Sequence, residues 1–109
     1  MVDYIPGTWG VFSYLEDGID KSNDFALTYQ AYKIIFDAKG TYEEFYRYQG
    51  VETSIQGTWT LENNNSNLIL IDNNPSSLQK MRVYQVTDII TIDAMKLCIS
   101  NKVYNYHKL

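Results

Sequence analysis

Residues 32–49 read YKIIFDAKGTYEEFYRYQ, and this stretch decides the fold class. Large apolar and aromatic residues recur at every second position on both sides of Ala38-Lys39-Gly40, and a three-residue loop that ends in glycine commonly joins antiparallel strands. Side chains on a strand alternate between two faces. The sequence therefore predicts a β-hairpin whose buried face carries Tyr32, Ile34, Phe36, Tyr42, Glu44, Tyr46 and Tyr48.

The rest of the chain repeats this pattern of short strands and turns. Further strands are expected over residues 8–15, 51–62, 68–71, 78–86 and 103–107. Segments 89–92 and 95–99 fit either a hairpin or one strand with a bulge at Asp93-Ala94. Ser22-Asn23-Asp24 offers a helix cap, so residues 19–30 are expected to hold a short helix or a structured loop. About eight strands without amphipathic helices between them favour an all-β antiparallel barrel or sandwich.

Length, charge and cysteine content exclude several classes of protein. The 109 residues fit one domain spanning residues 1–109, and no apolar run is long enough for a membrane helix. A net charge of −4 argues against nucleic acid as a partner. One cysteine and one histidine cannot form a disulfide framework or a Cys/His zinc site, so we expect neither a metal nor a cofactor.

Several short motifs occur in a characteristic order. Gly7-Thr8-Trp9 opens the first strand, Gly57-Thr58-Trp59 lies mid-chain, and Tyr104-x-Tyr106-x-Lys108 closes the sequence. Together with the hairpin, this series resembles the small bacterial lipocalin-like domains of the calycin class over nearly the whole chain. The resemblance implies a small up-and-down barrel of about eight strands, with a short helix or lid loop after the first strand.

The same resemblance implies roles for particular residues. Trp9 would close the bottom of the barrel and pack against a basic residue near the last strand, for which Lys108 is the candidate. Independently of the resemblance, the repeat of Gly-Thr-Trp at residues 57–59 predicts that Trp59 plugs an equivalent corner. The small bacterial relatives are often exported lipoproteins, which implies an extracytoplasmic location at the periplasm or cell surface. Residues 1–4 show no basic start followed by an apolar run, so no signal peptide is expected within this chain.

The side chains inside the barrel determine whether it can bind a ligand. Most inward residues are expected to be core, because an eight-stranded barrel is just wide enough to be filled or to hold one small ligand. The inner face is predicted to carry Trp9, Val11, Tyr32, Ile34, Phe36, Tyr42, Tyr46, Trp59, Leu61, Leu68, Leu70, Tyr84, Val86, Leu97 and Tyr104. A candidate pocket at the open end would be lined by Tyr46, Tyr48, Tyr84 and the lid residues Phe25 and Leu27. Tyrosine suits an amphipathic ligand, because its ring is apolar and its hydroxyl is polar.

A pair of opposite charges is also predicted on the inner face. Glu44 alternates with Tyr42 and Tyr46, and Arg82 shares a face with Tyr84. A buried carboxylate requires a partner, so the two side chains could meet inside the barrel and anchor a polar ligand group. The alternatives are a solvated pair at the rim or a different strand register.

Catalysis finds little support in the sequence. His107 has no evident partner, and Cys98 shares the face of Lys96, which is expected to point outward. Glu43 and Glu44 are adjacent on a strand and therefore point to opposite faces, so they cannot act together as acid and base.

These observations predict a non-enzymatic, lipocalin-like protein that binds a small apolar or amphipathic molecule at the barrel mouth. The alternative is an interaction module with a solid barrel. It would bind a glycan or a protein partner through exposed aromatic residues, namely Tyr14, Phe45 and Tyr106.

Overall fold

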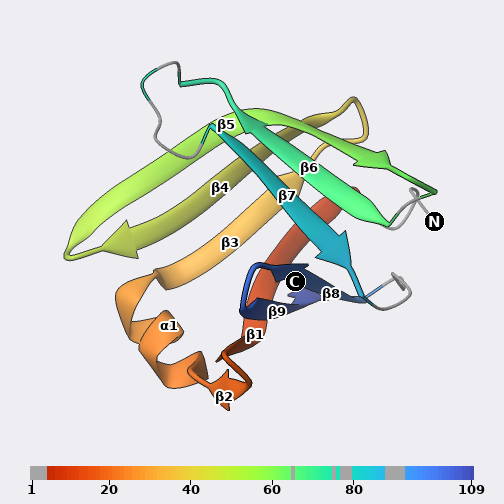
Figure 1. Ribbon diagram of the computed structural model, residues 1–109. Helices are drawn as coiled ribbons and strands as arrows, with labels where there is room; N and C mark the ends of the chain where they lie inside the picture. The colour runs from red at the N-terminus through yellow and green to blue at the C-terminus, as the bar shows by residue number, and fades with distance from the viewer. Residues whose placement is uncertain (1–4, 65, 75, 77–79, 88–92) are drawn as a thin grey trace.

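The computed structural model describes residues 5–64, 66–74, 76, 80–87 and 93–109. Their elements are β1 (Gly7–Glu16), β2 (Ile19–Asp20), α1 (Ser22–Thr28), β3 (Gln30–Phe36), β4 (Thr41–Tyr48), β5 (Val51–Glu62), β6 (Asn67–Asp72), β7 (Met81–Val86), β8 (Ala94–Ile99) and β9 (Lys102–Lys108). The sheet has the order β2-β1-β3-β4-β5-β6-β7-β8-β9, and β1 also pairs with β9 (Figure 1). Because this last pairing closes the sheet and all pairs are antiparallel, the predicted up-and-down barrel is confirmed.

The strand bounds agree closely with the sequence pattern. The predicted strand over residues 51–62 has the bounds of β5, and most others differ by one or two residues. The predicted start of a strand at residue 78 and the segment 89–92 lie outside the described residues. Within the part of the chain that is described, no helix is long and apolar enough to cross a membrane.

The short helix follows the first strands, as predicted, but its predicted cap is wrong. Helix α1 begins at Ser22, and its N-cap residue is Lys21, which makes no side-chain capping bond. Asp20 stabilises this turn instead, because its Oδ1 accepts hydrogen bonds from the Ser22 backbone N–H at 2.9 Å and from Ser22 Oγ at 2.5 Å.

The barrel core consists of the predicted inner face with a few additions. Its buried residues are Ile5, Trp9, Ile34, Phe36, Tyr42, Trp59, Leu68, Leu70, Tyr84, Met95, Leu97 and Tyr106, and Val11, Tyr32, Leu61, Val86 and Tyr104 pack against them. Tyr46 is half-buried. Burial of these large side chains supplies most of the favourable free energy of folding, which is why the strand register follows their alternation.

Two aromatic residues expected on the outside are buried. Tyr14 is 8% exposed and Tyr106 is 3% exposed, so the predicted outer aromatic surface of Tyr14, Phe45 and Tyr106 is wrong. Tyr106 shares the inner face of β9 with Tyr104. A shift in the pairing of β1 with β9 between Val11 and Ser13 leaves Phe12 as the extra residue. Such a bulge reverses the alternation that follows it, and Tyr14 therefore points inward.

The closed end of the barrel is built around Trp9, as the resemblance implies. Trp9 is fully buried and donates a hydrogen bond from Nε1 to the Ile5 carbonyl at 2.8 Å. Lys108 Nζ lies 4.9 Å from the centroid of the Trp9 ring, close enough for a cation–π interaction. Trp59 packs edge-on against Phe36, and its Nε1 donates to the Asp37 carbonyl at 2.9 Å.

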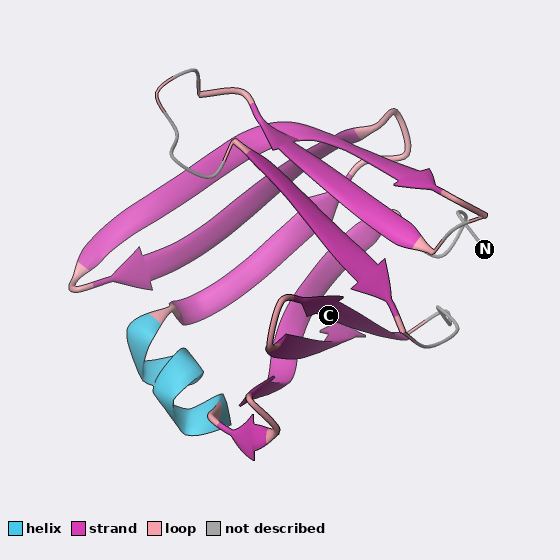
Figure 2. Cartoon of the chain, in the orientation of Figure 1, coloured by secondary structure: helices cyan, strands magenta, loops and turns pink. Residues whose placement is uncertain are grey.

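The opposite end, which we call the mouth, is where β1 and β3 separate. Their described pairing covers Gly7–Trp9 of β1 and Ile34–Phe36 of β3. Beyond it, α1 lies beside the two strands at the edge of the barrel (Figure 2). The ring of Phe25 from α1 packs against Tyr14, Tyr32 and Tyr104, with centroid distances of 5.3 to 6.0 Å. The helix therefore covers the gap between the strands.

Candidate functional site

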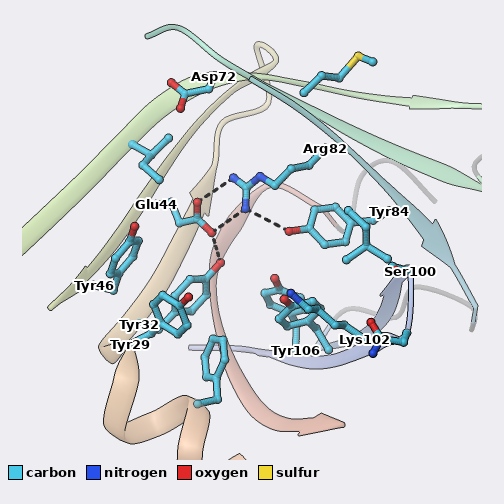
Figure 3. A pocket seen from close by; sticks show the side chains of 16 residues that line it. Tyr29, Tyr32, Glu44, Tyr46, Asp72, Arg82, Tyr84, Ser100, Lys102 and Tyr106 are labelled. Carbon is cyan, nitrogen blue, oxygen red and sulfur yellow. Dashed lines mark hydrogen bonds and ion pairs between the residues drawn. The ribbon is translucent and has the colours of Figure 1, made fainter. Parts of the chain in front are cut away.

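A cavity of about 900 Å³ extends from the mouth into the barrel (Figure 3). Its walls come from α1 and from strands on all sides. The lining residues are Phe25, Tyr29, Tyr32, Glu44, Tyr46, Ile55, Asp72, Met81, Arg82, Tyr84, Ile99, Ser100, Asn101, Lys102, Tyr104 and Tyr106. This volume lies within the range of sites that hold small organic molecules. The barrel is therefore open at its mouth and packed by side chains toward its closed end.

Glu44 and Arg82 form an ion pair inside this cavity. Arg82 Nη2 lies 2.8 Å from Glu44 Oε1, and Arg82 Nη1 donates to Glu44 Oε2 at 3.3 Å. The side chain of Glu44 is 4% exposed and that of Arg82 is 17% exposed. The predicted pairing is thus confirmed, and the alternative of a solvated pair at the rim is wrong.

Two tyrosines complete the hydrogen bonding of this pair. Tyr32 donates its hydroxyl proton to Glu44 Oε2, and the Tyr84 hydroxyl accepts a hydrogen bond from Arg82 Nη1 at 3.1 Å. Burial works against the charge of Arg82, but Tyr84 and Glu44 outweigh that effect and raise its pKa. The guanidinium therefore remains charged, and its charge is compensated by the protein itself.

Aromatic rings form the rest of the mouth. Tyr29 contacts Phe25 at a centroid distance of 5.1 Å and Tyr46 at 5.2 Å, which joins α1 to β4. Burial raises the pKa of Tyr32, Tyr84 and Tyr106, so these hydroxyls are protonated at neutral pH. A protonated hydroxyl can donate one hydrogen bond and accept others, which gives the cavity both kinds of group.

A smaller hollow of about 310 Å³ lies between α1 and strands β1 and β3. Phe25, Tyr29 and Tyr32 line both this hollow and the main cavity. These three rings therefore separate the two spaces, and the lid segment predicted at residues 19–30 lies where it was expected.

The structure gathers most of the predicted binding residues but not all of them. Phe25, Glu44, Tyr46, Arg82 and Tyr84 line the cavity. Leu27 does not line it and is 71% exposed, because it lies on the outer side of α1. Tyr48 also lies outside the lining and packs against Tyr29 at a centroid distance of 5.8 Å.

Other lining residues were missed from the sequence. Asp72 ends β6 with its side chain buried, and its Oδ1 accepts a hydrogen bond from the Asn74 N–H at 2.8 Å. Lys102 starts β9, one residue before the predicted strand. Lys102 is two residues before Tyr104, so side-chain alternation would have placed it on the inner face. It was missed because the predicted strand began at residue 103.

Comparison with known proteins agrees with this fold. The lipocalin-like domain family matches residues 5–97, and the chain therefore belongs to that family. No curated protein matches the chain.

Three solved structures with the same fold come from Bacteroides species. A lipocalin-like protein from Bacteroides uniformis has a TM-score of 0.74 at 14% identity, covering 96% of this chain and 98% of that one. An uncharacterized protein from Bacteroides eggerthii has a TM-score of 0.73 at 15% identity, covering 96% and 99%. A DUF4847 family protein from Bacteroides vulgatus has a TM-score of 0.60 at 16% identity, covering 95% and 93%. At these identities the similarity concerns the fold alone.

Proposed function

We propose that this protein is a non-enzymatic binding protein that holds a small amphipathic molecule in the cavity at the barrel mouth. The observation that carries the proposal is the cavity of about 900 Å³ with a buried Glu44–Arg82 pair on its wall. A barrel that served only as a scaffold would gain stability from filling this space with apolar side chains.

Different lining residues contact different parts of the ligand. Rings of Phe25 and Tyr46 offer apolar surface to the ligand body. Tyr84 accepts a hydrogen bond from Arg82, so its own proton remains for an acceptor atom of the ligand. Glu44 and Arg82 hold Tyr32 and Tyr84 in place, because each of these hydroxyls is bonded to one member of the pair.

A thermal-shift screen tests the proposal. The panel contains dodecanoate, retinol, haem, cholate and soluble oligosaccharides. A ligand at 100 times its Kd stabilises the folded state by about 2.7 kcal/mol, which raises Tm by roughly 10 °C or more for a domain of this size.

A matched pair of variants locates the site of any binding. Ile55 lines the cavity, so Ile55→Trp is expected to occupy the space and abolish the shift. Ser54→Trp places the same ring on the exposed outer face of β5 and is expected to leave the shift unchanged. Equal loss in both variants, or binding that survives Ile55→Trp, would contradict a site in the cavity.

A further inference from the structure

We infer that the ligand is a ring compound with hydroxyl groups around its edge, such as a saccharide or a polyphenol. This inference rests on the proposed function and names the chemical class that the same cavity selects. It excludes molecules with a single polar head and a long apolar tail.

The first argument is that polar groups occur on several walls of the cavity. Strand β4 contributes Glu44 and Tyr46, β7 contributes Arg82 and Tyr84, and β9 contributes Lys102. Figure 3 shows Lys102 on the side of the cavity away from Glu44. A ligand with one polar head would satisfy one wall and would cover the polar atoms of the others with apolar surface. Each hydrogen-bonding group left unpaired in this way weakens binding.

The second argument is that several polar groups of the lining have no partner among the residues that the structure describes. The hydroxyls of Tyr46 and Tyr104 and the ammonium of Lys102 make no hydrogen bond or ion pair with another described residue. The Tyr84 hydroxyl proton is likewise not donated to another described residue, because this hydroxyl accepts its hydrogen bond from Arg82. Donors on separate strands therefore face the same space, and a ligand with acceptors in several directions fits them.

The third argument concerns charge. Glu44 and Asp72 contribute two carboxylates to the lining, and Arg82 and Lys102 contribute two cations. Arg82 is already paired with Glu44, which leaves Asp72 and Lys102 as one further charge of each sign. The formal charges in the lining therefore cancel, and the cavity selects a neutral molecule. Hydroxyl groups provide hydrogen bonding without charge, and a ring offers flat apolar faces to the tyrosines.

The test uses pairs of compounds that share a scaffold and differ in hydroxyl groups. Quercetin is compared with flavone, and myo-inositol with cyclohexanol, by titration calorimetry or ligand-observed NMR. We expect the hydroxylated member of at least one pair to bind at least about tenfold more tightly, because sites built for hydroxyl groups reject analogues that lack them. Tighter binding of quercetin than of flavone indicates that the ligand has an aromatic ring. Tighter binding of myo-inositol than of cyclohexanol indicates that its ring is saturated.

Two further variants assign that preference to the cavity. Tyr46→Phe removes one unpartnered hydroxyl and keeps the ring, so it is expected to weaken the hydroxylated probe about fivefold and leave its bare scaffold unchanged. Tyr48→Phe is the control, since Tyr48 lies on the same strand outside the cavity.

Three outcomes would overturn the inference. They are equal or tighter binding of flavone and cyclohexanol, tighter binding of dodecanoate than of either hydroxylated probe, and binding by none of these compounds. The proposed function stands in each case if another amphipathic molecule in the thermal-shift panel binds and Ile55→Trp abolishes that binding. It fails together with the inference if nothing in either set binds.

Discussion

Glu44 and Arg82 are 38 positions apart in the chain, yet they meet inside the barrel with Arg82 Nη2 2.8 Å from Glu44 Oε1. Strands β4 and β7 are not neighbours in the sheet, so the pair joins two separate walls across the interior. Its hydrogen bonds extend to Tyr32 on β3 and to Tyr84 on β7. The polar side of the cavity is therefore one connected network.

Replacing one member of this pair is expected to destabilise the protein more than replacing both. Arg82→Met leaves the carboxylate of Glu44 buried without its partner, which should lower the free energy of unfolding by about 3 kcal/mol. The double variant Glu44→Leu, Arg82→Met replaces both charges by apolar groups and should be more stable than Arg82→Met alone. Urea unfolding of the two single variants and the double variant measures the coupling. Additive losses would show that the two side chains do not depend on each other.

Two inward-facing tyrosines on neighbouring strands should respond differently to loss of their hydroxyls. Tyr32 donates to Glu44, so Tyr32→Phe is expected to cost about 1–2 kcal/mol. The hydroxyl of Tyr42 is buried without a hydrogen-bond partner among the described residues. Tyr42→Phe should therefore leave stability unchanged or raise it by up to about 1 kcal/mol. Chemical denaturation distinguishes the two, and a comparable loss in Tyr42→Phe would indicate that its hydroxyl is bonded, with Arg82 as the nearest candidate.

The fold could be predicted because hydrophobic alternation and turn residues act locally. The loop at Ala38-Lys39-Gly40 shows this, since Asp37 and Thr41 pair across it and Gly40 has a positive φ of 97°. The inward position of Tyr14 could not be predicted, because the bulge at Phe12 depends on pairing with β9, whose residues are about 90 positions away.

The candidate site was predictable only in part, for a related reason. Alternation placed Glu44 and Arg82 on inner faces, and the buried carboxylate demanded a cation, so the pair followed from the sequence. The separation of β1 from β3 and the resulting size of the cavity depend on the geometry of the whole barrel. The size of the space at the mouth could therefore not be predicted from the inward side chains alone.

Stability is expected to fall in alkaline solution because of the buried tyrosines. Seven tyrosines, namely Tyr14, Tyr32, Tyr42, Tyr46, Tyr84, Tyr104 and Tyr106, have a pKa raised above 10.0, with burial as the main cause. Above pH 10 the unfolded chain releases these protons while the folded chain retains them. The folded state then binds more protons, so the free energy of unfolding decreases as pH rises.

The contribution of these tyrosines is complete below pH 10 and is lost progressively above it. Tyr32 and Tyr106 should each contribute to this loss of stability, because burial raises the pKa of both hydroxyls well above 10.0. Urea midpoints measured between pH 8 and pH 11 give the slope, and Tyr106→Phe should make it shallower. Unchanged midpoints up to pH 11 would show that the tyrosines titrate alike in the folded and unfolded chains.

Gly57 is expected to tolerate no side chain, because β4 and β6 approach it from both sides. It pairs with Tyr42 of β4 and with Asp72 of β6, and a Cβ atom added there would lie 1.9 Å from the Ile71 carbonyl oxygen and 2.7 Å from Tyr42 Cε1. The first of these contacts is with backbone, which can move only if the β5–β6 pairing opens. Gly57→Ala should therefore lower the free energy of unfolding by about 3 kcal/mol or prevent folding.

Gly50 is the matched control for this variant. It lies in the β4–β5 turn with a φ of 79°, and an added Cβ atom would meet no atom within 4 Å. Gly50→Ala should cost only about 1 kcal/mol, the strain of a left-handed backbone conformation in a residue other than glycine. Thermal unfolding of both variants separates the two effects. Equal losses would contradict the prediction, because they would show that the close approach of the strands at Gly57 does not restrict its side chain.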